Sequence, residues 1–252
     1  MIVPAGTVEV DGQGLRRMTA EVEIRTLDTP DDMASIVEVL QQVWGTRTPI
    51  VNVELLRAMA HSGGYVAGAF DHDRLVGASF GFLASHNGEP ALHSHVTGIL
   101  PCLQRTGVGR SVKFHQREWA AARGIAWITW TFDPIVRRNA WFNLEVLGAR
   151  VSEYVVNFYG SMSDSINAHD ESDRLVVAWP TDPARPRPMP PDGATTVHVD
   201  TPEDIVLLRR TDQAEAMRWR RHVRDELCER MDAGATVTGF TREGQYVLQV
   251  VA

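Results

Sequence analysis

The segment Gln104-Arg105-Thr106-Gly107-Val108-Gly109-Arg110 has the residue types and spacing of an anion site built from backbone groups. Its two glycines lie two positions apart, directly before an expected helix, and let the backbone approach a ligand without a Cβ contact. The N–H groups in the first turn of that helix have no intrahelical partners, so they face the ligand and favour a negative charge. This arrangement predicts a bound diphosphate.

Two better-known phosphate motifs do not occur in the sequence. There is no G-x-x-x-x-G-K-[ST] pattern, which excludes a P-loop nucleotide triphosphatase. There is also no G-x-G-x-x-G followed by an acidic residue about 20 positions later, so a dinucleotide-binding fold has no support. The alternative interpretation of the segment 104–110 is a tight turn between a strand and a helix that binds nothing.

His93 and His95 are the candidates for a general base. They lie two positions apart on an expected strand, so both side chains leave the same face. An imidazole with an ordinary pKa near 6.5 can accept a proton at neutral pH. The alternative is that one or both are core histidines hydrogen-bonded to the backbone. We expect no metal here, because no third ligand occurs at a diagnostic spacing.

Asp133 follows the next expected strand and should lie near the same cleft, because the carboxyl ends of strands gather ligands. It is a candidate catalytic residue that orients a histidine or binds a substrate ammonium group. The alternative is that Asp133 and the proline after it form only a turn.

Hydrophobic spacing and turn residues predict the elements that position these groups. Helices are expected at 29–44, 52–61, 109–123 and 136–147, and strands at 22–27, 64–70, 74–82, 91–100, 125–132, 151–158 and 175–179. The first helix has the strongest start, because Thr29 supplies an N-cap hydroxyl, and Pro30 and the carboxylates after it suit the first turn.

The C-terminal part is expected to form an extension. Residues 180–193 are dense in proline and predict an extended linker. In the extension, 194–252, one helix is expected to start at Thr201, a second to run from Thr211 to about Met231, and a hairpin to follow at 236–240 and 246–251. Arginines of the second helix alternate with acids, which favours a solvated, salt-bridged face over a site for carboxylate substrates. Residues 1–21 are expected to be disordered.

Composition narrows the class of protein. A chain of 252 residues, 44% hydrophobic, can bury a full core. Its formal net charge of −7 argues against a general nucleic-acid binder. Cys102 and Cys228 lie far apart, which suits a reducing cytoplasm and offers no zinc spacing. No apolar run reaches the roughly 20 residues that span a bilayer, and the N-terminus lacks the pattern of a signal peptide. We expect a cytoplasmic protein without membrane or nucleic-acid partners.

The order of elements from residue 91 onward resembles the heart of the GNAT acyltransferase superfamily. Arg105-Thr106-Gly107-Val108-Gly109-Arg110 is similar to its acyl-CoA loop, and residues 137–149 resemble its later helix, which ends in L-G-[FA]. Four shorter segments resemble a poorly characterised bacterial branch of predicted acetyltransferases: 92–95, 130–134, 138–140 and 157–160. The resemblance implies a mixed α/β (α+β) GNAT fold with its core at 22–179.

The resemblance also implies roles for individual residues. The backbone of 104–110 would hold the diphosphate of acyl-CoA, and the backbone of Thr97, Gly98 and Ile99 would contact pantetheine where the strand splays from its neighbour. His93 stands about where several members carry a catalytic glutamate. Asn139 and Asn143, four apart on one helix face, are candidates to contact CoA or substrate.

One departure concerns the general acid. Many GNAT enzymes carry a tyrosine four residues before the glycine that ends the later helix, and here that position is Leu144. Tyr154 and Tyr159 are alternative acids, water is another, and the CoA thiolate is itself a tolerable leaving group. Cys102 suggests a covalent acyl-cysteine route, but it stands beside the expected loop rather than opposite a base.

These observations predict an acyl-CoA-dependent N-acyltransferase in which an amine attacks the thioester directly. Acetyl-CoA is the default donor, and succinyl-CoA with an amino-acid acceptor is the alternative that the resemblance suggests. Two other classes stay open: a catalytically inactive acyl-CoA-binding regulatory module, and an interaction scaffold with a vestigial loop. We expect a small-molecule amine or amino acid as acceptor and leave a homodimer open.

Overall fold

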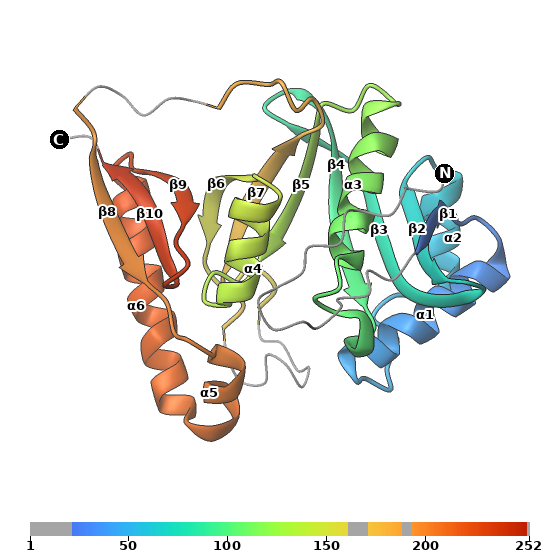
Figure 1. Cartoon of the computed structure of the whole chain (residues 1–252), viewed down its shortest axis with the longest axis horizontal. Coiled ribbons are helices and arrows are strands. Elements are labelled where there is room, and N and C mark those ends of the chain that lie inside the picture. The colour runs from blue at the N-terminus through green and yellow to red at the C-terminus, as the bar shows by residue number, and fades with distance from the viewer. Residues whose placement is uncertain (1–21, 161–170, 188–192, 251–252) are drawn as a thin grey trace, which may run out of the picture. The chain divides into compact units, whose positions relative to one another are not determined.

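The computed structural model describes residues 22–160, 171–187 and 193–250 (Figure 1). The expected disorder of residues 1–21 lies outside these ranges. The chain forms two compact units, residues 1–128 and 129–252. This division runs through the segment 22–179 that we expected to form one core, and the boundaries at 179 and 193 stay predictions.

The first unit holds an antiparallel sheet and three α-helices. In chain order its elements are β1 (Glu23–Thr26), α1 (Pro30–Trp44), α2 (Val53–His61), β2 (Tyr65–Asp71), β3 (Arg74–His86), β4 (Glu89–Ile99), a 3-10 turn (Pro101–Leu103) and α3 (Val108–Ala121). Neighbouring strands pair antiparallel in the order β1-β2-β3-β4. The strand β5 (Trp127–Phe132) begins at the end of this unit and continues into the second.

Helix α1 begins as the sequence predicts. The Thr29 hydroxyl accepts the Asp32 N–H, the Asp32 carboxylate accepts the Thr29 N–H, and Pro30 occupies the first helical position. Each group satisfies a donor that the start of a helix leaves without a partner. The predicted start of α1 is therefore confirmed.

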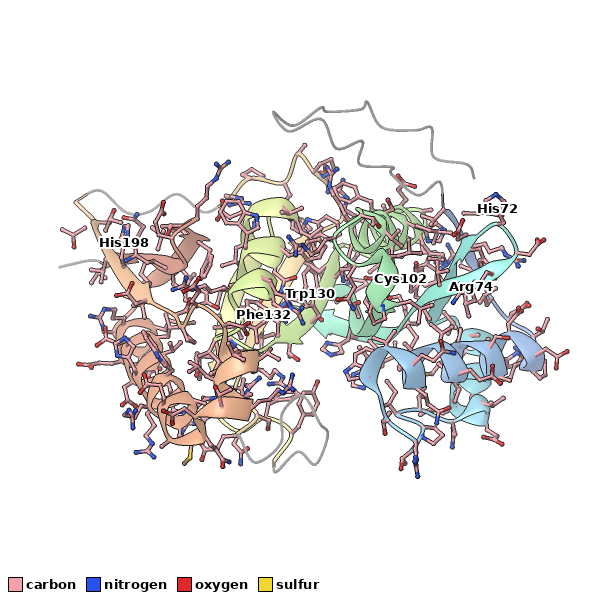
Figure 2. The ribbon with its side chains drawn as sticks, turned by 60° about the horizontal axis from the view of Figure 1, so that its bottom comes forward. His72, Arg74, Cys102, Trp130, Phe132 and His198 are labelled. Atoms are coloured by element: carbon pink, nitrogen blue, oxygen red, sulfur yellow. The ribbon has the colours of Figure 1, made fainter. Side chains whose placement is uncertain are left out.

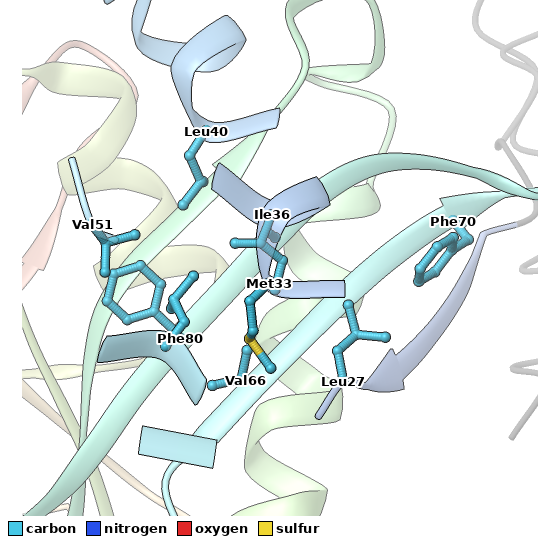
Figure 3. Close-up of a cluster of buried hydrophobic side chains, with 10 residues drawn as sticks. Leu27, Met33, Ile36, Leu40, Val51, Val66, Phe70 and Phe80 are labelled. Atoms are coloured by element: carbon cyan, nitrogen blue, oxygen red, sulfur yellow. The ribbon is translucent and has the colours of Figure 1, made fainter. Parts of the chain in front are cut away.

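Alternating side chains of β2 pack on opposite faces of the sheet. Val66 and Phe70 join the cluster under α1 and α2, with Met33, Ile36 and Leu40 from α1 (Figure 3). Tyr65, on the opposite face of the strand, contacts Trp119 of α3 with the ring centroids 5.2 Å apart. The period of two along a strand accounts for this division. Helices α1 and α2 therefore cover one face of the sheet, and α3 covers the other.

The second unit contains the rest of the chain. After β5 come α4 (Arg137–Trp141), a π-helical segment (Phe142–Val146), β6 (Arg150–Val155), β7 (Arg174–Pro180), β8 (Thr195–Asp200), α5 (Ile205–Thr211), α6 (Gln213–Asp232), β9 (Thr236–Phe240) and β10 (Gln245–Val250). β6 and β7 pair antiparallel. β8, β10 and β9 form a separate antiparallel sheet in that order. The expected mixed α+β class is confirmed.

The second unit differs from the sequence prediction at three points. The strand β8 was not expected, because only Val197 and Val199 mark it in the sequence. α5 begins after Asp204, whose carboxylate caps it, and not at Thr201. Thr201 is instead buried, and its hydroxyl donates to the Gly244 carbonyl. The expected single helix 136–147 changes from α to π geometry at Phe142.

In the described ranges, no helix is long and apolar enough to cross a membrane.

Candidate active site

The segment between β4 and α3 forms an open loop that ends at the start of the helix. Gly107 adopts φ +98° as the N-cap of α3, a conformation that L side chains rarely adopt. Among the described residues, no side chain caps the first turn, and a Cβ built on Gly107 meets no atom within 4 Å. The start of α3 is therefore compatible with an anion on its backbone N–H groups, and binding of a diphosphate there stays a prediction.

Two side chains of the loop brace it rather than face a ligand. The Gln104 amide donates to the Ile99 carbonyl at 3.0 Å, and the Thr106 hydroxyl donates to the Leu103 carbonyl at 2.7 Å. Arg105 and Arg110 are exposed at the two ends of the loop, and the Arg110 guanidinium also lies over the Phe114 ring. The predicted role of 104–110 thus rests on its backbone and on these two cations.

β4 has a bulge at the second histidine. Val96 pairs with Phe80 of β3 while Ser94 pairs with Gly81, which leaves His95 as the extra residue. The His93 and His95 ring centroids lie 6.1 Å apart, and both rings contact Phe82, at 5.1 and 5.7 Å. The strand therefore brings the two candidate bases together beside one exposed aromatic ring.

The backbone of residues 97–99 pairs regularly with β3. The irregular pairing between β4 and β3 lies at His95 and not at these residues. A Cβ at Gly98 would lie 2.7 Å from the Trp44 ring, so glycine is needed there for the packing of α1. Contact of this backbone with pantetheine stays a prediction.

The electrostatic environment of β4 favours neutral imidazoles. Burial, followed by the charges of His95 and Lys113, lowers the pKa of His93 to about 4, and burial lowers the pKa of His95. A histidine whose pKa lies below its ordinary value is neutral at physiological pH. His93 is therefore neutral, as a base must be before it acts, and the same low pKa makes it a weaker base than an ordinary histidine.

Lys113 is the only lysine of the chain, beside 24 arginines, and it is buried under β4. Its ammonium donates to the Ser94 hydroxyl at 3.0 Å and to the Gln116 amide oxygen at 2.9 Å. Gln116 reaches the Ser79 hydroxyl, which is hydrogen-bonded to Thr97 at 2.8 Å. This polar network joins α3 to the strand that carries both histidines, and the sequence analysis missed it.

Lys113→Met should flatten the pH dependence of stability between about pH 7 and 10. Burial lowers the pKa of Lys113 to about 7, so above that pH the unfolded chain binds a proton that the folded chain does not. The wild-type free energy of unfolding should therefore rise with pH across this range. Urea titrations of both proteins at pH 7 and 10 measure the effect, and an equal rise in the variant would contradict it.

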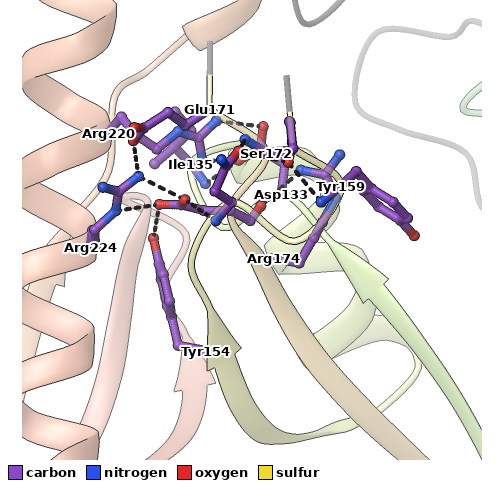
Figure 4. A network of polar contacts seen from close by, with 12 residues as sticks. Asp133, Ile135, Tyr154, Tyr159, Glu171, Ser172, Arg174, Arg220 and Arg224 are labelled. Carbon is purple, nitrogen blue, oxygen red and sulfur yellow. Dashed lines mark hydrogen bonds and ion pairs between the residues drawn. The ribbon is translucent and has the colours of Figure 1, made fainter. Parts of the chain in front are cut away.

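Asp133 lies in a buried ion-pair cluster in the second unit, shown in part in Figure 4. Its carboxylate accepts two hydrogen bonds from Arg220, at 2.8 and 3.0 Å, and one from Arg209 at 2.6 Å. Burial alone would raise the pKa of Asp133, but the two arginines outweigh it and lower the pKa to about 2. These contacts account for Asp133 without a catalytic role.

The arginines of α6 form salt bridges as expected, but they do not all lie on one solvated face. Arg220 is 2% exposed, and Arg224 pairs with Asp173 and Glu171 (Figure 4). Only part of the cluster, such as Arg218 with Glu215, has the expected exposed character. A signal was available in the spacing, because Arg220 occupies the helical stripe of the buried residues Ala216, Val223 and Leu227.

The remaining candidate site residues of the second unit, two asparagines and two tyrosines, differ in how far their side chains are exposed or already hydrogen-bonded. Asn143 is buried and accepts the Trp130 indole N–H at 3.2 Å, which gives it a structural role. Asn139 is half-buried on α4 and stays a candidate. Tyr154 donates to Asp173 at 2.7 Å, and burial together with that acid raises its pKa. Tyr159 is 42% exposed, which leaves its hydroxyl the more accessible of the two.

Leu144, which stands where many GNAT enzymes carry a tyrosine, is buried. Cys102 is exposed in the 3-10 turn between β4 and α3 (Figure 2). Among the described residues, no group of three or more histidine, cysteine or acidic side chains is placed to hold a metal ion.

Solved structures share this arrangement of strands and helices. A probable acetyltransferase from Staphylococcus epidermidis ATCC 12228 matches with a TM-score of 0.51 and 16% identity, over 64% of this chain and 99% of that chain. Aminoglycoside 6'-acetyltransferase type Ii matches with a TM-score of 0.50 and 16% identity, over 66% and 99%. The fold is a GNAT fold.

The ribosomal-protein-S18-alanine N-acetyltransferase from Escherichia coli is also similar, with a TM-score of 0.49 and 18% identity over 65% of this chain and 96% of that chain. No protein-family model matches the sequence, and no curated protein matches it significantly. At these identities the likeness concerns the fold, so activity has to be argued from the residues of the chain itself.

Proposed function

We propose that the chain is an acyl-CoA-dependent N-acyltransferase. The observation that carries the proposal is the pairing, within one unit, of an uncapped helix start at Gly107 with a neutral histidine on the strand that leads into it. The first feature suits a diphosphate, and the second suits removal of a proton from an amine. The GNAT fold agrees with both.

The proposed binding step uses the loop 104–110. The backbone N–H groups at the start of α3 would hold the diphosphate, and the exposed Arg105 and Arg110 would add positive charge beside it. The exposed surface of Gly107 leaves room for a phosphate group to approach. The backbone of Thr97, Gly98 and Ile99 would contact the pantetheine chain.

The proposed chemical step uses His93, with His95 as the alternative base. The neutral imidazole accepts a proton from the acceptor ammonium, directly or through water, and the freed amine attacks the thioester carbonyl. The carbon–sulfur bond then breaks and sulfur leaves with the electron pair as thiolate. The proton that the attacking nitrogen loses on becoming an amide passes through water to this thiolate, which leaves as CoA thiol.

We take acetyl-CoA as the donor and a small amine or amino acid as the acceptor. One structure of the same fold is named for acetylation of aminoglycosides, which are amines, and this agrees with an amine acceptor. Succinyl-CoA with an amino-acid acceptor remains the alternative donor and acceptor pair. The exposed Phe82 ring, which contacts both histidines, offers an apolar surface to an acceptor.

The assay that tests the proposal measures release of CoA thiol from acetyl-CoA and succinyl-CoA over a panel of amines and amino acids. The proposal expects turnover with at least one acceptor and its loss in His93→Ala. Saturable binding of acetyl-CoA without turnover on any acceptor would favour a regulatory module that has lost catalysis. The leucine at position 144, where many GNAT enzymes carry a tyrosine, would be consistent with that outcome.

His93 should still be neutral at pH 6, where an ordinary histidine is largely protonated. The prediction follows from the lowered pKa, since the charged form appears only as the pH falls toward about 4. Nitrogen chemical shifts of the imidazole, followed by NMR between pH 4 and 8 and assigned with His93→Gln, measure it directly. Protonation of His93 with a midpoint near 6.5 would contradict the described environment of β4.

A further inference from the structure

A cavity of about 550 Å³ opens between α4 and the turn that joins β9 to β10. Its volume lies in the range of ordinary small-molecule sites. The lining combines two kinds of side chain, namely the aromatic rings of Trp141, Phe142 and Phe240 and the guanidinium groups of Arg137, Arg138 and Arg242. The cavity belongs wholly to the second unit, and nothing in the proposed acyl transfer uses it.

In the part of the chain that the structure describes, no acidic side chain neutralises the cations of this cavity. Arg137 donates to the carbonyl and the hydroxyl of Thr201, both uncharged, and Arg242 lies over the Trp141 ring at 6.0 Å. Across the described ranges, neither these two nor Arg138 forms an ion pair, and no acidic side chain lines the cavity. Glu145 lies near, but its carboxylate accepts the Phe240 N–H at 2.8 Å.

The turn is shaped to keep one cation in place. Gly244 adopts φ +92°, and a Cβ built there would lie 2.1 Å from Nε of Arg137. Only glycine lets the guanidinium lie against the turn with its charge at the cavity. Arg138 and Arg242 are exposed and stand free to move toward a ligand.

We propose that this cavity binds a nucleotide, with the base against the aromatic rings and a phosphate among the three guanidinium groups. Aromatic and guanidinium faces stack on planar bases, and the guanidinium fork matches phosphate oxygens. A phosphate monoester with nearly two negative charges suits three cations better than a carboxylate with one. The proposal goes beyond acyl transfer and does not depend on it.

The test is a calorimetric titration of the full chain with AMP, beside adenosine and inorganic phosphate. The proposal expects saturable binding of AMP and much weaker binding of the two fragments. The double substitution Arg138→Glu and Arg242→Glu should weaken AMP binding by about ten-fold or more, because it removes charge-assisted hydrogen bonds. Arg221→Glu, an exposed arginine of α6 outside the cavity, should leave the affinity unchanged.

A second variant separates the cavity from the glycine loop. Gly107→Trp, which should block the loop, is expected to keep AMP binding. Absence of AMP binding by the wild type would overturn the proposal. So would binding that survives the double substitution but is lost in Gly107→Trp, because the nucleotide would then sit on the loop.

Discussion

Asp133→Ala should lower the free energy of unfolding by about 3–5 kcal/mol, which is the usual cost of removing one partner from a buried ion pair. Arg209 and Arg220 are 5% and 2% exposed, so the substitution leaves two desolvated cations without this acid. Their release from burial would require α5 and α6 to move away from the end of β5. Chemical denaturation at neutral pH measures the change.

Two controls make the result specific. Asp225→Ala removes an exposed acid from α6 and should change stability by no more than about 0.5 kcal/mol. Asp133→Ala combined with Arg220→Met should be less destabilised than Asp133→Ala alone, because one buried charge disappears. A loss below about 1 kcal/mol for Asp133→Ala would contradict the cluster.

Because of the same ion-pair cluster, we expect the free energy of unfolding to decrease at acidic pH. The pKa of Asp133 lies at about 2 in the folded chain, below its ordinary value. Its contribution is therefore complete above about pH 4 and is lost as the pH falls toward 2. In Asp133→Ala this part of the decrease should be absent. Chemical denaturation of the wild type and the variant at pH 3 and 6 measures the difference.

Gly107→Trp should abolish binding of acetyl-CoA, with affinity reduced by at least about 100-fold, which corresponds to about 2.7 kcal/mol. The residue lies at the start of α3 with open space above it, so an indole there covers the N–H groups that the diphosphate would use. The positive φ adds backbone strain of about 1–2 kcal/mol, which the fold should tolerate.

Gly88→Trp provides the matched control. Gly88 also has a positive φ, +77°, and open space around its Cβ position, but it lies in the exposed turn between β3 and β4. The substitution Gly88→Trp therefore imposes a similar backbone strain on the same unit, but it does not cover the loop 104–110. Equal loss of acetyl-CoA affinity in both variants would show that strain, and not occlusion of the loop, is responsible.

Local rules were sufficient for the parts of the chain that depend on neighbouring residues. The capping box at Thr29, the β2–β3 hairpin and the glycine start of α3 all follow from short-range sequence patterns. Each of these features satisfies or exposes backbone groups within a few residues, so their prediction needs no tertiary information.

The missed features depend on partners far along the chain. β8 is stabilised by β10, which starts at Gln245, 50 residues after the start of β8 at Thr195, and its own alternation of apolar residues is weak. Asp133 was assigned to the cleft from its place after a strand, whereas α5 and α6 supply the arginines that hold it. The π-helical turn after α4 coincides with the bond from Trp130 to Asn143, which spacing along one helix cannot reveal.

Lys113 was overlooked for a different reason. A single lysine on an amphipathic helix is ordinarily placed on the solvent face. Its burial follows from three partners that sequence spacing does not join, namely Ser94 on β4, Gln116 on α3 and, through it, Ser79 on β3.

The most direct test of the account is a calorimetric titration of the wild-type chain with acetyl-CoA, with Gly107→Trp titrated in parallel. The account predicts saturable binding to the wild type and none to the variant. No heat of binding in the wild type, or equal affinity in both proteins, would show that the loop 104–110 is only a turn between β4 and α3.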